Sequence, residues 1–337
     1  MESFPIIENI TLSFLNVSNE IYPLIKSIRP DWTLSNTRLV TFTEGLTNTI
    51  LGLFDIRTPA DDSNALVIKI YGLQTELFID RQAEIKAMTK FYEHGVFPQR
   101  VLIQFTNGVI YEYASGQTCT RDNVRDEHIS RLVAIKLAQL HNVTIDEVKK
   151  PYIMLLLRRF IKLLNVNNFD LTSIISDVDM IEEQILPRLI PDPKIGIDLV
   201  LCHNDLLVKN IVYNEKDQTV SFIDFEYTHV NYALFDVANH FVEYAGVENA
   251  DFDIYPSRDE QKRWLKFYFQ TRAIHEQVID DKLCLVVDQF SALSNLMWGL
   301  WALVQAKVSN LDFDYVNYAN KRLDRYRKLR KLLFENE

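Results

Sequence analysis

Three polar residues in the stretch from Leu201 to Tyr227 have the types and the spacing that phosphoryl transfer needs. Asp205 ends a His-Asn-Asp sequence, Asn210 follows five residues later, and Asp224 follows fourteen residues after Asn210. This chemistry requires a carboxylate near the attacking hydroxyl, and an asparagine with a second carboxylate to hold Mg²⁺ against the phosphates. Each of the three residues lies at the end of an apolar segment, so we expect all three in one site.

A hairpin is expected to bring these residues together. Residues 211–213 and 220–223 are short apolar runs, and the polar residues 214–219 between them are typical of a turn. Such a hairpin would return Asp224 to the side of Asn210. A His-x-Asp-x-x-x-x-Asn loop, a hairpin and a metal-binding Asp occur in that order in the lower lobe of kinases. The stretch therefore predicts a kinase-type catalytic centre.

The chain before this stretch is predicted to form a sheet with one helix. Apolar and β-branched runs predict strands at residues 38–42, 49–54, 66–71, 100–106 and 109–113. An Asn107-Gly108 turn joins the last two strands, and helical spacing predicts a helix over residues 80–94. In kinases a third-strand lysine contacts the phosphates and a helix carboxylate holds it. Lys69 and Glu84 stand in that order, with Glu76 as the weaker candidate. A solvent-facing lysine and a solvated glutamate are the structural alternatives.

Two loops of this half are candidates for nucleotide contacts. Residues 44–48 (EGLTN) join the first two strands, and a plain hairpin turn is the alternative because the turn holds one glycine. Glu112 and Tyr113 leave the last strand in an extended linker whose backbone groups could contact an adenine ring. We place the boundary between two lobes at this linker, with residues 1–112 before it and 113–337 after it.

The second half is expected to be mainly helical. The spacing of its apolar residues predicts helices over residues 126–141, 151–164 and 171–186. Asp236 is expected to cap the helix that follows it by accepting backbone N–H bonds. Asn239 and His240 are expected to be buried hydrogen-bonding groups.

Aromatic residues of the second half could form a cation site. Trp298 and Trp301 are three residues apart on one predicted helix, and Tyr315 and Tyr318 follow that helix. A core stripe is the structural alternative, but ring faces also attract a cation, by up to about 2 kcal/mol for a desolvated contact. Glu243 adds a carboxylate among aromatic residues, which favours an ammonium ligand and hence a small amino alcohol as phosphoryl acceptor.

Several motifs resemble the choline/ethanolamine kinase family. The similarity runs from about Phe42 to Tyr326, and its motifs are HNDLLVKNI (203–211), FIDFEY (222–227), NYALFDVANHFVEYAGV (231–247), YPSRDEQ (255–261) and WGLWALVQAK (298–307). Leu206-Leu207 after the HND sequence and Tyr244 after Glu243 are similar to the ethanolamine kinase branch. Choline kinases more usually carry Gln-Glu-Gly and Trp at those places.

The resemblance implies an α+β, protein-kinase-like two-lobe fold, with an N-terminal antiparallel sheet plus one helix and a larger, mainly helical C-terminal lobe. It implies ATP and Mg²⁺ as cofactors, bound between the lobes, with residues 1–112 binding the nucleotide and residues 113–337 carrying catalysis and amine binding. The acceptor would be ethanolamine, and the product phosphoethanolamine would enter the CDP-ethanolamine route to phosphatidylethanolamine. A choline kinase or a dual choline/ethanolamine kinase is the nearest alternative; an aminoglycoside kinase and an inactive scaffold are more distant ones.

Residue roles follow from the same resemblance. Asp205 would be the catalytic base, and Asn210 and Asp224 would bind Mg²⁺. The nucleotide would contact Gly45, Thr47, Asn48, Lys69, Glu84, Glu112 and Tyr113. The amine pocket would comprise Tyr227, Glu226, Glu243, Tyr244, Trp298, Trp301, Tyr315 and Tyr318.

Composition limits the remaining choices. The chain has 337 residues, of which 47% are hydrophobic, and this suits a globular protein of two domains. The net charge of −10 argues against a nucleic-acid or anionic-membrane partner, because both require a basic surface. Three cysteines without metal-site spacing, and no signal peptide or membrane-length apolar run, predict a cytoplasmic protein without membrane insertion. No motif sets the oligomeric state, and the sequence is compatible with a homodimer.

Overall fold

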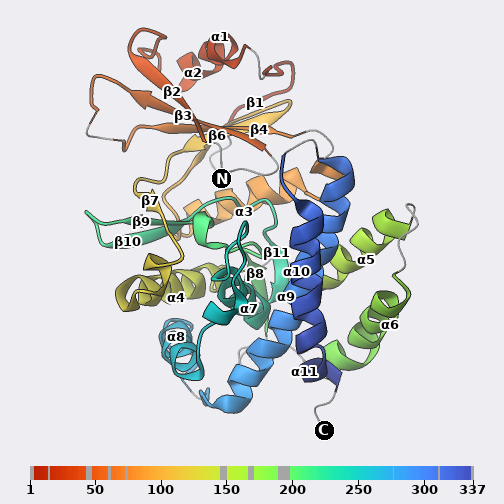
Figure 1. The fold of residues 1–337 in the computed structure, drawn as a ribbon. Helices are drawn as coiled ribbons and strands as arrows, with labels where there is room; N and C mark the ends of the chain where they lie inside the picture. The colour runs from red at the N-terminus through yellow and green to blue at the C-terminus, as the bar shows by residue number, and fades with distance from the viewer. Residues whose placement is uncertain are drawn as a thin grey trace. The chain divides into compact units, whose positions relative to one another are not determined.

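The chain forms two compact units, residues 1–116 and residues 117–337, in the computed structural model. The described residues are 4–13, 16–42, 48–59, 62–72, 75–144, 150–165, 171–188, 198–275, 277–309 and 312–334. The first unit contains a sheet and few helices, and the second is mainly helical (Figure 1). The division falls after residue 116, whereas the sequence suggested a boundary after residue 112.

The first unit is built on a six-stranded sheet with the order β1-β5-β6-β4-β3-β2. Its strands are β1 (Ile6–Ile7), β2 (Thr37–Phe42), β3 (Asn48–Asp55), β4 (Leu66–Tyr71), β5 (Val101–Phe105) and β6 (Gly108–Glu112). The five strands expected from the sequence are confirmed, and their pairings are antiparallel. β1 was not expected, and it adds to β5 in parallel.

The two faces of β4 have different neighbours. Ile68 and Ile70 point to a core formed with Leu24 and Trp32, so the N-terminal segment covers this face of the sheet. That segment contains α1 (Val17–Glu20) and α2 (Tyr22–Ile28) (Figure 1). Lys69 alternates with these isoleucines and meets the helix α3 (Arg81–Glu93), which Asp80 caps by accepting the N–H groups of Gln82 and Ala83.

The β5–β6 hairpin differs in one detail from its prediction. Its loop residues are Thr106 and Asn107, and Gly108 is already paired with Phe105 in the sheet. A Cβ at position 108 would overlap the carbonyl of Lys69 on β4. Gly108 is therefore needed for close approach of the strands rather than for the turn.

The second unit contains most of the helices. They are α4 (Glu127–His141), α5 (Tyr152–Asn165), α6 (Thr172–Met180), α7 (Ala233–Glu243), α8 (Arg258–Thr271), α9 (Asp281–Val308), α10 (Tyr315–Leu329) and α11 (Lys331–Phe334). The three helices predicted at residues 126–186 are present, although the last one changes at Ile181–Ile185 into a π-helical turn.

Two small sheets position the catalytic stretch within the second unit. β7 (Gln117–Thr118), β9 (Ile211–Asn214) and β10 (Thr219–Phe222) form one, and β8 (Leu199–Cys202) and β11 (His229–Tyr232) form the other. The predicted hairpin is confirmed as β9–β10, with Phe222 paired to Ile211.

Helix α9 is the longest element and the centre of the second unit. It is long and apolar enough to cross a membrane, but 78% of its most apolar window is buried inside the protein. α10 packs along it, and an added Cβ at Gly299 of α9 would come within 2.7 Å of the Leu323 side chain of α10. This burial is that of a core helix.

Candidate active site

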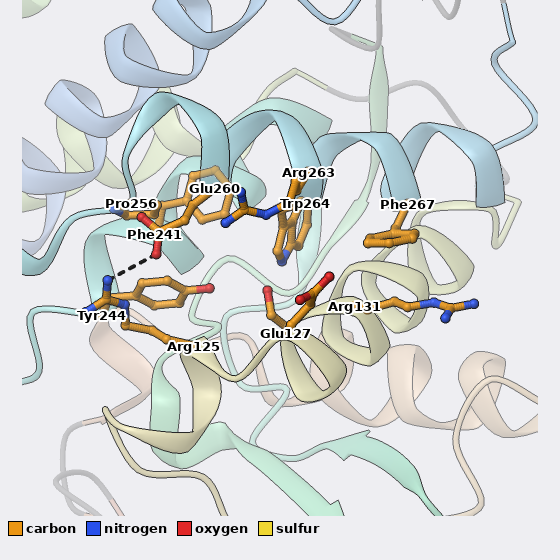
Figure 2. Close-up of a pocket in the computed structure, with 11 residues that line it drawn as sticks. Arg125, Glu127, Arg131, Phe241, Tyr244, Pro256, Glu260, Arg263, Trp264 and Phe267 are labelled. Atoms are coloured by element: carbon orange, nitrogen blue, oxygen red, sulfur yellow. Dashed lines mark hydrogen bonds and ion pairs between the residues drawn. The ribbon is translucent and has the colours of Figure 1, made fainter.

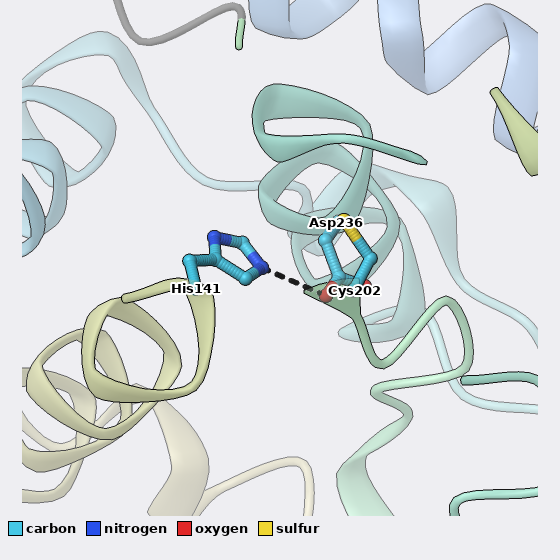
Figure 3. A group of neighbouring side chains, drawn as sticks. All are labelled: His141, Cys202 and Asp236. Atoms are coloured by element: carbon cyan, nitrogen blue, oxygen red, sulfur yellow. Dashed lines mark hydrogen bonds and ion pairs between the residues drawn. The ribbon is translucent and has the colours of Figure 1, made fainter. Parts of the chain in front are cut away.

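Asp236 holds the backbone of the loop that carries Asp205. One oxygen of its carboxylate, Oδ2, accepts the N–H of His203 at 2.7 Å, and the other, Oδ1, accepts the N–H of Asn204 at 2.8 Å. The Nε2–H of His141 also donates to Oδ2 at 3.0 Å (Figure 3). The prediction that Asp236 caps its own helix is wrong: it lies within the first turn of α7 and is committed to the catalytic loop.

Asn204 gives the loop its local shape. Its φ of 64° lies in the left-handed region, which asparagine tolerates better than most residues. Its side-chain Nδ2 donates to the Tyr227 carbonyl at 2.9 Å, and its Oδ1 accepts from Asn231 Nδ2 at 2.8 Å. Both the backbone N–H and the side chain of Asn204 therefore stabilise the loop.

Asp205 and Asn210 lie together, and the hairpin extends to Asp224. Asn210 Nδ2 donates to the Asp205 carbonyl at 2.9 Å and lies 3.5 Å from the carboxylate oxygen Oδ2. The N–H of Ile223 donates to the Asn210 carbonyl at 3.0 Å, which places Asp224 beside this pair. Asp224 has a φ of 63°, an uncommon value for aspartate. The structure thus brings the three predicted catalytic residues together.

His203 links the loop to the segment around Asp224. Its ring nitrogen Nε2 lies 3.0 Å from the Ile223 carbonyl, and the Asp205 N–H lies 3.3 Å from Nδ1. The ring packs against Phe225 with centroids 5.2 Å apart. Because burial lowers the pKa of His203, the ring is neutral and serves this structural role without carrying charge.

The carboxylates around Asp205 make the centre favourable for cations. Burial raises the pKa of Asp205 well above its usual range, and the negative charges of Asp224, Glu243 and Glu226 raise it further. Asn210 turns Nδ2 toward Asp205, which leaves its Oδ1 for another partner. Carboxylate and amide oxygens are the ligands Mg²⁺ prefers, so Asn210 and Asp224 fit the predicted metal site.

A second polar cluster nearby is structural. The ligand atoms of His141, Cys202 and Asp236 lie within 4.8 Å of one another, and all three residues are buried (Figure 3). Asp236 already accepts three N–H donors, and the other ring nitrogen of His141 lies 2.7 Å from the Tyr268 hydroxyl. Burial raises the pKa of the Cys202 thiol well above its usual range, which disfavours the thiolate that a metal needs. Hydrogen bonds therefore account for this cluster.

An aromatic cluster lies in the same unit as Asp205. Its members are Tyr227, Trp298, Trp301, Tyr315 and Tyr318, and the rings of neighbouring members meet edge to face with centroids 5.3 to 6.5 Å apart. Trp301 Nε1 donates a hydrogen bond to the Tyr227 hydroxyl at 2.8 Å, which links these two members of the cluster. Phe313 joins the cluster through Tyr315 at 4.8 Å. The structure brings these five predicted pocket residues together.

Asn239 and His240 of α7 are the buried hydrogen-bonding groups that the sequence predicted. Asn239 Oδ1 accepts hydrogen bonds from Trp298 Nε1 and from Ser294 Oγ, both at 2.8 Å. His240 Nδ1 lies 3.3 Å from the Leu206 carbonyl. Both side chains are fully buried, which confirms the prediction of buried hydrogen-bonding groups.

Glu243 already has a cationic partner. Arg322 on α10 donates from Nη2 to Glu243 Oε1 at 2.6 Å, and both side chains are buried. Arg322 was not among the residues predicted for the site. Its signal was present, because Tyr315, Tyr318, Arg322 and Tyr326 recur at the spacing of one helix face, and this face is buried.

Two other predicted pocket residues have different surroundings. Glu226 is buried and its charge acts on Asp205 and on Tyr227. Tyr244 packs its ring against His240 and Phe241 and lines a cavity of about 60 Å³ among residues of α4, α7 and α8 (Figure 2). Among the described ring contacts, none joins Tyr244 to the aromatic cluster.

In the first unit, Lys69 and Glu84 form the expected pair. Lys69 Nζ donates to Glu84 Oε1 at 2.5 Å, with both side chains almost completely buried. Arg81 donates from Nη1 to the other oxygen, Oε2, at 3.0 Å, and its guanidinium lies 4.2 Å from the centroid of the Tyr71 ring. Glu84 therefore binds two cations rather than one.

The structure describes some of the other residues that were predicted to contact the nucleotide. Gly45 and Thr47 lie outside the described residues. Asn48 begins β3, and its Oδ1 accepts Arg81 Nη2 at 2.7 Å. The N–H groups of Glu112 and Tyr113 donate to the carbonyls of Arg100 and Ala65 at 3.1 and 3.0 Å. An adenine contact by these two residues would therefore have to use other groups.

Comparison with known proteins gives consistent results. The sequence pattern of the choline/ethanolamine kinase family matches residues 39–327. Ethanolamine kinase 1 of Homo sapiens is 36% identical over 325 residues, covering 91% of this chain and 70% of that protein. The probable ethanolamine kinase of Nematostella vectensis is 36% identical over 327 residues, covering 92% of each.

Solved structures show the same likeness. Plasmodium vivax ethanolamine kinase has a TM-score of 0.81 at 25% identity, covering 97% of this chain and 92% of that one. Choline kinase from Cryptosporidium parvum has a TM-score of 0.77 at 21% identity, covering 93% and 96%. The expected protein-kinase-like fold is thereby confirmed, and with the Asp205 loop it defines a phosphotransferase. The chain belongs to the choline/ethanolamine kinase family.

Proposed function

We propose that this protein is an ATP-dependent ethanolamine kinase, which transfers the γ-phosphate to the hydroxyl of ethanolamine and yields phosphoethanolamine and ADP. The observation that carries the proposal is that Asp205, Asn210 and Asp224 lie together in the unit that also holds Glu243 and the aromatic cluster. Relatives named ethanolamine kinase, at 32 to 36% identity, support the choice of acceptor.

In this proposal Asp205 accepts the hydrogen bond of the ethanolamine hydroxyl and orients its oxygen toward the γ-phosphorus. Asn210 and Asp224 would hold Mg²⁺, which neutralises charge on the phosphate oxygens when bound. Lys69, held by Glu84, would contact a phosphate of ATP. Most of the rate enhancement would come from positioning and charge stabilisation, because phosphoryl transfer has little covalent chemistry for the protein to perform.

The ammonium group would bind at Glu243 and the faces of the aromatic cluster. The carboxylates that raise the pKa of Asp205 include Glu243 and Glu226, so this region favours a cation. A primary ammonium has three N–H donors that need acceptors, and the carboxylates supply them. Choline is the second candidate acceptor, because a trimethylammonium group needs ring faces, which the cluster also offers.

The cellular setting follows from the same proposal. We infer a cytoplasmic enzyme without membrane insertion, since α9 is mostly buried within the protein. Its product would enter the route through CDP-ethanolamine to phosphatidylethanolamine.

Product analysis tests the proposed function. The purified protein is incubated with ATP, Mg²⁺ and ethanolamine and followed by ³¹P NMR. A phosphomonoester signal that matches authentic phosphoethanolamine should grow in equal amount to ADP. Growth of inorganic phosphate alone, or no reaction with ethanolamine, would contradict the proposal.

A further inference from the structure

Arg322 is a fully buried cation beside the proposed amine pocket. Its guanidinium carbon lies 4.9 Å from the centroid of the Tyr318 ring and 5.6 Å from that of Phe252. Its exposed fraction is 0%, and Glu243 is its one carboxylate partner among the described residues. Arginine is rarely buried to this extent unless it is paired.

Stability alone gives a weak reason for this pair. Removing two charges from water costs several kcal/mol per ion, and apolar replacements of buried pairs are often neutral or stabilising. The same helix shows an alternative, since Arg330 at its end pairs with Asp177 while its own side chain stays 42% exposed. Arg322 of α10 is fully buried beside Glu243, the last residue of α7. Its burial therefore indicates a role in the site.

The two carboxylate oxygens of Glu243, Oε1 and Oε2, have different surroundings. Oε1 accepts the N–H of Arg322, and within the described part of the chain Oε2 accepts no hydrogen bond. A carboxylate can accept from two sides, so Oε2 can receive a second donor while Oε1 keeps its first. A primary ammonium supplies such a donor, and a trimethylammonium does not.

We propose that Arg322 is a positioning residue that determines acceptor specificity: it holds Glu243 so that Oε2 receives an N–H of the ethanolamine ammonium. The inference rests on the proposed function and deepens it. Glu243 would then bridge two cations, the resident guanidinium and the bound ammonium. This arrangement favours ethanolamine over choline, because choline has no N–H to donate.

The electrostatic setting supports the proposal. Burial raises the pKa of Glu243, and the positive charge of Arg322 and its hydrogen bond oppose that rise. Arg322 therefore favours the ionised form of the Glu243 carboxylate as well as orienting it. Without Arg322, the pKa of Glu243 would be higher, and a protonated Glu243 would bind the ammonium less well.

The test compares Arg322→Met, Glu243→Gln and the double variant with both acceptors. We expect Arg322→Met to lower kcat/KM for ethanolamine by about tenfold or more, chiefly through KM, and that for choline by less than about threefold. KM for ATP should not change. The double variant should be no worse than Glu243→Gln alone, because Arg322 acts through Glu243.

Two further variants separate positioning from stability. Arg322→Lys keeps the charge and should restore part of the preference for ethanolamine. Arg330→Met breaks another ion pair of the same segment, away from Glu243, and should lower the melting temperature while leaving both KM values for the amines unchanged.

The outcomes are distinguishable. Equal losses for ethanolamine and choline, additive effects of the two single substitutions, or no change in Arg322→Met would overturn the role of Arg322. If Arg322→Met does not fold, an Arg322→Lys variant with unaltered amine preference but lowered stability would overturn it as well. A wild-type protein that does not phosphorylate ethanolamine would instead overturn the proposed function, and the inference with it.

Discussion

At the scale of single residues, Asp205 and Asp236 show how environment assigns different roles to two buried aspartates. Asp236 is surrounded by donors, and although its burial acts in the opposite sense, the hydrogen bond from His141 helps hold its pKa below the usual range. Burial raises the pKa of Asp205, and the carboxylates around it raise that pKa further. Asp236 is therefore suited to hold a loop, and Asp205 is suited to contact a cation and a hydroxyl.

Asp205→Asn should remove turnover while leaving the fold intact. The amide can keep the hydrogen bond with Asn210 through its oxygen, but it cannot serve as a proton acceptor. We expect kcat to fall by about 10²- to 10⁴-fold, the usual contribution of a positioned acid–base group. Steady-state kinetics, with the melting temperature and ATP affinity as controls, checks this. A loss of folding in parallel with activity would count against the catalytic role.

Asp236→Asn should affect both stability and catalysis. An asparagine has one carbonyl oxygen in place of two, so it cannot accept from His203, Asn204 and His141 in the same geometry. Breaking such a buried charged network should lower the free energy of unfolding by about 3 kcal/mol. Urea denaturation measures this, and kcat should fall because the Asp205 loop loses its anchor. Unchanged stability and kcat would show that the loop is held in another way.

At the scale of elements, β4 and α3 together position the charged ammonium group of Lys69. Lys69 lies on the face of β4 opposite Ile68 and Ile70, and Glu84 lies in the first turn of α3. Lys69 and Glu84 are both buried and compensate each other's charge, and Arg81 supplies a second cation to Glu84.

Lys69→Met should weaken nucleotide binding selectively. We expect KM for ATP to rise by about tenfold or more, which corresponds to about 1.4 kcal/mol of binding energy, while KM for the amine changes little. Lys86→Met is the control substitution, because Lys86 is an exposed lysine of α3, the helix that carries Glu84. An unchanged KM for ATP in Lys69→Met would contradict the phosphate role.

The sequence predicted most elements near the site because their signals are local. Apolar and β-branched runs identified β2 to β6, and the polar run between two apolar segments identified the β9–β10 hairpin. β1, β7, β8 and β11 are short, and their pairings join residues far apart in the chain, so no local pattern reveals them. The π-helical turn after α6 has no sequence signal that we recognise.

The predicted site was incomplete for the same reason. Asp205, Asn210 and Asp224 are encoded by spacing along one stretch, and the structure brings them together. Arg322 and the loop-holding role of Asp236 depend on contacts between distant segments. Tyr244 was selected because it follows Glu243, but an adjacent helical residue points about 100° away, and it faces the cavity of Figure 2 instead.

At the scale of the whole molecule, α9 and the net charge predict behaviour toward membranes. α9 is apolar enough to insert, yet most of its apolar window is buried inside the protein. A chain of net charge −10 is also repelled by anionic lipid.

We therefore expect the protein to stay in solution without detergent and not to float with vesicles that contain phosphatidylserine. Flotation in a density gradient measures this at low and at physiological salt. Flotation that salt does not reverse would show that α9 or another apolar segment enters the bilayer.

The ratio of kcat/KM for ethanolamine to kcat/KM for choline identifies the preferred acceptor. The ratio is measured on the purified protein with saturating ATP and Mg²⁺ across the concentration range of each amine. We predict a ratio of about ten or more, which is about 1.4 kcal/mol of transition-state discrimination. A ratio near one or below would show that the aromatic cluster accepts either amine and that Glu243 does not discriminate between them.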